Sequence, residues 1–225
     1  MNLGKKKTIS IVIQLSLVCV GVSMVATAQE MEHNMAGHAG HAMEMSMGHE
    51  HHGSDVPVTY EELTKTASLL QTARQATTKY REVRVAESDG YKAIGPDVPG
   101  MGIHYVHVGP HSPGFKVEQP DILLYEKNPA APSGYALVGV SYLLNAEADA
   151  DGQPKNPPFP KSLANWHRHS NLCVFPDRSV KGDLSDSQCQ AGGGHFTAET
   201  QWMIHAWIWK DSPTGVFSPT NPNVQ

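Results

Sequence analysis

The thirteen histidines of this 225-residue chain fall into two groups that could do different chemistry. Six of them lie between residues 31 and 53 in a tract of Met, His and Gly, MEHNMAGHAGHAMEMSMGHEHHG. The other seven occur singly or in close pairs within segments whose composition is that of a folded domain. We interpret the first group as a means of capturing metal ions, and the second as candidates for a built metal site.

The tract combines thioethers with imidazoles, a mixture that favours copper. Soft sulfur ligands hold Cu(I) and imidazole nitrogen holds Cu(II), whereas a zinc or nickel scavenger would have little use for so many methionines. The alternative is a flexible linker with a biased composition. The residues predicted to capture metal are Met31, His33, Met35, His38, His41, Met43, Met45, Met47, His49, His51 and His52.

The segment Trp166-His167-Arg168-His169 favours a metal site in the folded part of the chain. Residues two apart on a strand point to the same side, so both imidazoles could approach one ion while Trp166 and Arg168 face the other way. Two histidines on a solvated strand face are the alternative.

His104 and His107 differ by three positions, so a regular strand sends them to opposite faces. We favour His104 as the ligand, because Gly100 and Gly102 allow the backbone to approach a site closely. His107 is equally consistent with a surface position.

Glu126 and His205 complete the predicted ligand set. Glu126 shares a strand face with Ile122 and Leu124, where a carboxylate is costly unless it is paired or binds a cation. It could instead reach solvent at the strand end, pair with a neighbour of Lys127, or act as a catalytic base. His205 lies in the aromatic run WMIHAWIW and is consistent with either a buried core residue or a ligand.

The chain divides into three predicted parts. Residues 1–28 have a lysine-rich start, an apolar stretch and a small-residue end, which is typical of a secretory signal; a membrane anchor is the alternative. Residues 29–56 lack the branched apolar side chains that a core needs, which predicts a disordered tail. Residues 57–225 are expected to form one metal-binding domain, exported to the periplasm or secreted, with no membrane insertion after signal cleavage.

Charge argues against several partners. Signal removal would take away three lysines and no acids, so the net charge would change from −5 to −8. Nucleic acids and anionic membranes need a basic patch, and cations suit this chain better. Patterns for serine nucleophiles, phosphate loops and dinucleotides are also missing from the sequence.

Two cysteines follow the predicted signal, Cys173 and Cys189. In an oxidising compartment an even pair that closes a short loop is most simply a disulfide, with a stabilising effect of about 3 kcal/mol. Thiolate metal ligands are the alternative, although the wide spacing lacks the usual Cys-x-x-Cys pattern.

The periodicities predict an α+β fold that is mainly β, with a sandwich or barrel-like sheet and one long N-terminal helix. Thr59 and Glu62 form a capping box for a helix over residues 60–87. Turn clusters separate the predicted strands, which span residues 102–108, 121–127, 135–144, 163–174 and 201–210.

Several blocks after Tyr91 resemble a group of exported bacterial proteins of poorly defined function: GMGIHYVH, QPDILLYE, WHRHSNLC, AGGGHF, WMIHAWIW and SPTGVFSPTNP. This resemblance implies that Cys173 and Cys189 are partners. It also implies that five side chains converge, namely His104, Glu126, His167, His169 and His205. A weaker analogy to cupin barrels concerns the metal site alone, because the glutamate that cupins place shortly after His-x-His is missing here.

Two functions of different class follow from these residues. The first is an exported metal-binding protein for copper capture, storage or resistance, with a His/Glu site in the folded domain, which could also take zinc or iron. It could hand the ion to an unknown metal-transport partner. The second is a mononuclear metalloenzyme, a hydrolase or oxidoreductase, that uses the same centre with an open coordination position. A sheet pocket for a small organic ligand, walled by tryptophans, is a third and weaker hypothesis.

Overall fold

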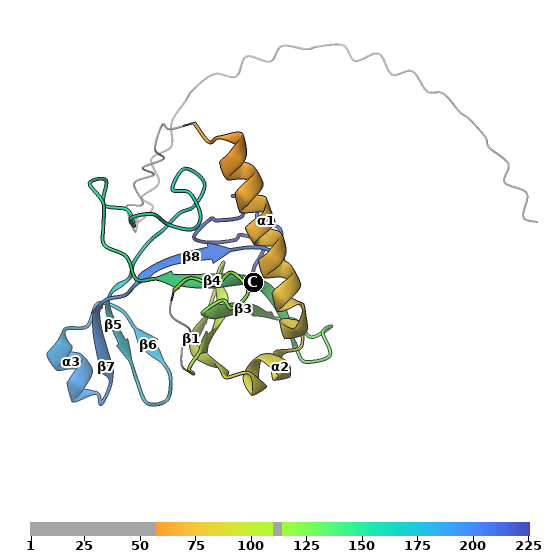
Figure 1. Cartoon of the computed structure of the whole chain (residues 1–225). Helices are drawn as coiled ribbons and strands as arrows, with labels where there is room; N and C mark the ends of the chain where they lie inside the picture. The colour runs from red at the N-terminus through yellow and green to blue at the C-terminus, as the bar shows by residue number, and fades with distance from the viewer. Residues whose placement is uncertain (1–56, 110–113) are drawn as a thin grey trace, which may run out of the picture. The chain divides into compact units, whose positions relative to one another are not determined.

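Two antiparallel sheets and a long N-terminal helix form the part of the chain that the computed structural model describes, residues 57–109 and 114–225 (Figure 1). The larger sheet has the strand order β1-β2-β3-β4-β8 and the smaller sheet the order β6-β5-β7. The predicted α+β, mainly β class is confirmed. The strands are β1 (Tyr91–Val98), β2 (Gly102–His107), β3 (Ile122–Lys127), β4 (Tyr135–Leu144), β5 (Ser170–Val174), β6 (Val180–Lys181), β7 (His195–Glu199) and β8 (Trp202–Ala206).

The N-terminal helix begins as its sequence predicts. Thr59 caps α1 (Tyr60–Thr77), and its hydroxyl accepts from the backbone N–H of Glu62 while the Glu62 carboxylate accepts from the N–H of Thr59. A continuous helix over 60–87 is wrong, because α1 tightens into a 3₁₀ helix (Thr78–Arg81) and α2 (Val83–Ser88) starts only after an extended Glu82. The buried Tyr125 hydroxyl donates to the backbone oxygen of Tyr80 at 2.6 Å, and it thereby takes the acceptor that a continuing helix would use.

One face of the larger sheet packs against α1 and α2 and carries the main core. Ala73 and Tyr80 from the helical segment meet Leu123, Val140 and several aromatic side chains of the strands there. The start of α1 takes no part in this contact, since Leu63 is 48% exposed. The opposite face holds a smaller apolar cluster of Ile122, Leu124, Val138, Met203, Trp207 and Val224.

Four of the five predicted strands correspond to strands of the larger sheet, with ends that agree within a few residues. The predicted strand over 163–174 is right only for its last five residues, which form β5. The sequence did not predict β1, β6, β7 or the short helix α3 (Asp186–Ala191). In β1, Gly95 and Pro96 hide the strand pattern, and the register with β2 is irregular between Ile94 and Val98.

A disulfide between Cys173 of β5 and Cys189 of α3 ties the smaller sheet to its helix. The predicted pairing is therefore confirmed, and the two thiols are not metal ligands. Gly194 lies so close to both sulfurs that a Cβ at this position would overlap them, which explains the glycine just before β7. The bond is consistent with an oxidising compartment.

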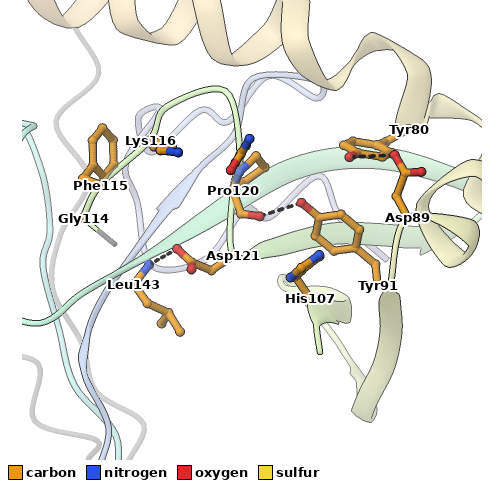
Figure 2. A pocket seen from close by; sticks show the side chains of 11 residues that line it. Tyr80, Asp89, Tyr91, His107, Gly114, Phe115, Lys116, Pro120, Asp121 and Leu143 are labelled. Atoms are coloured by element: carbon orange, nitrogen blue, oxygen red, sulfur yellow. Dashed lines mark hydrogen bonds between the residues drawn. The ribbon is translucent and has the colours of Figure 1, made fainter. Parts of the chain in front are cut away.

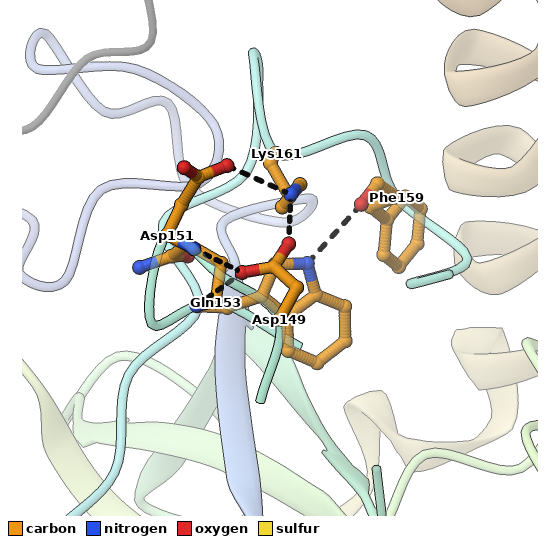
Figure 3. A network of polar contacts seen from close by, with 6 residues as sticks. Asp149, Asp151, Gln153, Phe159 and Lys161 are labelled. Carbon is orange, nitrogen blue, oxygen red and sulfur yellow. Dashed lines mark hydrogen bonds and ion pairs between the residues drawn. The ribbon is translucent and has the colours of Figure 1, made fainter. Parts of the chain in front are cut away.

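Polar contacts fix the loop that precedes His167 (Figure 3). Asp149 accepts hydrogen bonds from the backbone N–H groups of Asp151 and Gln153, and it forms an ion pair with Lys161. The indole N–H of buried Trp166 then donates to the backbone oxygen of Phe159 at 3.1 Å. These contacts hold the chain in place immediately before the His-x-His segment.

No helix within residues 57–109 and 114–225 is long and apolar enough to span a bilayer.

Candidate metal centre

Four imidazoles meet on the face of the larger sheet that lies opposite α1. The ring centres of His104 and His205 are 5.6 Å apart, those of His167 and His205 are 5.4 Å apart, and those of His167 and His169 are 5.2 Å apart. The four residues come from β2, from β8 and from the segment that leads into β5. The structure therefore brings together the four predicted histidines from three distant parts of the sequence.

Curvature of the sheet makes the contact between His104 and His205 possible. Neighbouring strands lie about 4.8 Å apart, so β2 and β8, three steps apart in the strand order, would be roughly 14 Å apart in a flat sheet. Two histidine side chains cannot span that separation with their rings in contact. The sheet must therefore curl toward this face, and β3 and β4 form the floor beneath the two rings.

His167 and His169 reach the cluster from a segment that runs along the edge of β8. His167 exchanges two backbone hydrogen bonds with Met203, at 3.0 and 2.7 Å. Arg168 points the other way, with its guanidinium 2.5 Å from a Glu199 carboxylate oxygen and 4.1 Å from the centre of the Trp202 ring. This alternation is the one predicted from the His-x-His spacing.

Backbone carbonyls orient the imidazoles. His205 Nδ1 lies 2.7 Å from the oxygen of Pro219, and His167 Nδ1 lies 3.2 Å from the oxygen of Asn165. A carbonyl can only accept, so the Nδ1 atom of each ring carries the proton, and Nε2 keeps its lone pair. The backbone of Gly102 forms a further hydrogen bond with His104. Metal-binding histidines are held in this way by a partner on the ring nitrogen that faces away from the ion.

Burial favours the neutral form of His104, His169 and His205. It lowers the pKa of His104 to about 4 and that of His205 to about 3, and the neighbouring imidazoles add to both effects. Burial also lowers the pKa of His169. Because a metal ion competes with protons for the same lone pairs, neutral imidazoles are the form that can bind one.

Two buried polar atoms near the cluster have no hydrogen-bond partner in the described part of the chain: Nε2 of His205 and the hydroxyl of Ser141. His205 is only 1% exposed and Ser141 is fully buried. A buried polar atom without a partner is uncommon and often indicates a missing ion or water. Sequence reasoning missed Ser141, although a single serine within the apolar run of β4 is the signal that could have revealed it.

Glu126, the fifth predicted ligand, forms an ion pair in this structure. It follows Leu124 on the same face, as predicted, but its Oε2 atom lies 2.6 Å from Nζ of Lys210. The cation that compensates this buried carboxylate is thus a lysine 84 residues away in the sequence, which no local pattern reveals. This ion pair accounts for the buried carboxylate without a metal ion, so the ligand set proposed below leaves Glu126 out.

His107 faces the opposite side of the sheet from His104. Its ring packs edge-on against Tyr91, with centres 5.1 Å apart, and both residues line a cavity of about 360 Å³ together with Tyr80, Asp89 and Asp121 (Figure 2). His107 is half-buried there and is not a simple surface residue. His111 and the eleven predicted capture residues of the tail lie outside the described residues.

The conformation of the rings is not that of a loaded site. Within the described ranges, no set of three or more His, Cys, Asp or Glu side chains is arranged to hold a metal ion. The ring planes of the three contacting pairs meet at 57°, 81° and 86°. The centres are nevertheless close to the spacing that a shared ion imposes, because two imidazoles bound tetrahedrally at about 2.0–2.1 Å place their ring centres roughly 5 Å apart.

Comparison with known proteins does not identify the chain. No family model, curated protein or solved structure matches it. The function is therefore inferred from the four imidazoles and their surroundings.

Proposed function

We propose that this protein is an exported metal-binding protein that captures copper and holds one ion with His104, His167, His169 and His205. The observation that carries the proposal is the contact of four imidazoles from three segments, joined by ring-centre distances of 5.2 to 5.6 Å. Two imidazoles that share a tetrahedral ion have ring centres roughly 5 Å apart, close to the spacing of these three pairs.

The surroundings support a metal site over an ordinary cluster of core histidines. A buried imidazole usually finds partners for both nitrogens, yet His205 has none for Nε2 among the described residues. Burial and the neighbouring imidazoles lower the pKa of His205, so protonation does not compensate for the burial of this ring. A cation bound by their lone pairs would compensate for their burial.

Copper is the metal that suits the whole chain best. Four nitrogen ligands accept zinc, nickel, iron or copper, and Cu(II) binds most tightly in the general order of divalent affinities. The Met/His tract between residues 31 and 53 adds the thioethers that hold Cu(I). In this proposal the tract collects copper and the folded domain stores it, in the periplasm or outside the cell, where the disulfide persists.

Copper stoichiometry tests the proposal. The mature chain is loaded with Cu(II), dialysed and measured by elemental analysis, alongside a full-length variant whose eleven tail Met and His residues are replaced by serine. We expect this tail variant to keep about one copper per chain. His205→Ala in the same background should lose it, and so should His169→Ala, which changes a less buried position and is safer for folding.

His195→Ala is the matched control, because His195 lies exposed on β7, and this variant should keep its copper. A tail variant that folds but retains no copper would contradict the proposal. Copper binding would then belong to the tract alone.

A further inference from the structure

Ser141 stands out on the floor of the histidine site because nothing in the described structure satisfies its hydroxyl. The residue is 0% exposed, and it interrupts the apolar strand YALVGVSYLL of β4. Its Oγ atom has no hydrogen-bond partner. An unsatisfied buried hydroxyl costs free energy that alanine at the same position would avoid. A serine here therefore indicates that a partner is present in the working protein.

The sheet register places this hydroxyl at the histidines. Ser141 pairs with His205 on β8 and with Ile122 on β3, and directly paired residues point to the same face of a sheet. The curl that brings His104 within 5.6 Å of His205 leaves β4 beneath the two rings. The hydroxyl thus lies on the face of the sheet that carries His104 and His205, directly beside His205.

The histidines cannot themselves serve as the missing acceptor once an ion is bound. The Nδ1 atom of His205 faces the Pro219 oxygen and carries a proton. Under the proposed function, the remaining nitrogen lone pairs of the cluster bind the metal. No acceptor in the cluster is then left for the Ser141 hydroxyl.

We infer that the bound ion keeps a further coordination position, and that Ser141 donates a hydrogen bond to the small exogenous ligand there. Water, hydroxide or a monovalent anion fits, since each can bind a metal and accept a hydrogen bond at one atom. This inference rests on the proposed metal site. An open coordination position would distinguish two possible functions of the site, because metal storage needs no open position and metal-assisted catalysis requires one.

Azide binding to the copper-loaded protein tests this inference, since azide is a monovalent anion and gives a charge-transfer absorption band on Cu(II). The full-length tail variant provides the background, so that copper in the tract does not contribute. We expect a saturable azide band, and we expect Ser141→Ala to weaken azide binding about tenfold with copper stoichiometry unchanged. A loss of this size corresponds to one charge-assisted hydrogen bond.

Thr66→Val is the matched control. Thr66 also carries a buried hydroxyl without a partner in the described structure, but it belongs to α1, which packs against the opposite face. This variant should bind azide as the tail variant does. Ser141→Ala is expected to fold normally, because it removes an unsatisfied polar atom.

The outcomes are distinct for the two proposals. Copper bound without an azide band means a closed site, and equal azide affinity in Ser141→Ala means that the hydroxyl does not contact the ligand. Either result overturns the inference and leaves the copper site standing. Failure of the tail variant to bind copper at all overturns both.

Discussion

The Nδ1 atom of His205 lies 2.7 Å from the backbone oxygen of Pro219, so the most buried histidine of the cluster is tied to the C-terminal segment. This contact fixes the tautomer that leaves Nε2 available. The segment is held in turn by the fully buried Asn221, whose side-chain N–H group donates to the backbone oxygens of Lys210 and Asp211 at 3.1 and 3.3 Å. The geometry of the site thus depends on residues that could not touch a metal.

Asn221→Ala should reveal this dependence. The change removes two hydrogen bonds that Asn221 donates to backbone oxygens and one that it accepts from the N–H of Asn223, and we expect the free energy of unfolding to fall by about 2–3 kcal/mol. Copper affinity should fall as well, because Pro219 is no longer held against His205. Denaturant unfolding and copper competition measure the two effects. Gln190→Ala, at an exposed position on α3, is the control. Stability lost with copper affinity intact would contradict a positioning role for the C-terminal segment.

Replacing Glu126 should affect stability and not metal binding. Glu126→Ala leaves the partly buried ammonium of Lys210 without its partner, and we expect a loss of about 1–3 kcal/mol. The double variant Glu126→Leu/Lys210→Met should recover most of this, because it removes both charges together. Copper stoichiometry should be unchanged in both variants. A single variant that folds but loses its copper would show that Glu126 is a ligand after all.

Loss of the disulfide should likewise lower stability and leave copper binding unchanged. Replacing Cys173 and Cys189 together by serine opens a loop between residues 16 positions apart, with an expected loss of about 3 kcal/mol in the free energy of unfolding. Thermal unfolding of the oxidised parent and of the double variant measures this loss. Because His167 and His169 lie before β5, outside this loop, the folded variant should keep its copper. A double variant that loses its copper but keeps the stability of the parent would contradict this prediction.

Stability of the metal-free protein should fall on the acid side of neutrality. His104 and His205 have native pKa values of about 4 and about 3, whereas an unfolded histidine titrates near 6.5. The unfolded chain therefore takes up protons first as the pH falls. The contribution of these residues is fully present above about pH 6.5 and is lost progressively as the pH drops toward 3.

Chemical unfolding of chelator-treated protein between pH 8 and pH 4 would show this slope. His104→Gln should flatten it, since glutamine does not titrate in this range. An identical slope in the parent and the variant would mean that His104 is not buried in its neutral form.

Local signals explain what the sequence could predict of the fold. The cap of α1 depends on Thr59 and Glu62, three positions apart, and β4 follows from its own apolar pattern. The helix breaks after Arg81 because the Tyr125 hydroxyl bonds the backbone oxygen of Tyr80. Tyr125 is distant in the sequence, so the periodicity of the helix could not predict this break. The weak β1 was missed because Gly95 and Pro96 interrupt its pattern.

Local patterns likewise predicted only part of the candidate metal site. Alternation along a strand was enough to put His167 and His169 on one side and to separate His104 from His107. The same rule placed Glu126 on the right face but could not reveal its ion pair with Lys210. Whether β2 and β8 approach each other depends on the curl of the whole sheet, which no single segment encodes.

Electron paramagnetic resonance of the Cu(II)-loaded tail variant tests the central claim most directly, because hyperfine coupling to nitrogen reports the imidazoles bound to the ion. We predict coupling from several histidine nitrogens in the parent, and fewer coupled nitrogens or no bound copper after replacement of His104, His167, His169 or His205 by alanine. A spectrum that shows no imidazole coupling, or that survives all four replacements unchanged, would contradict the account.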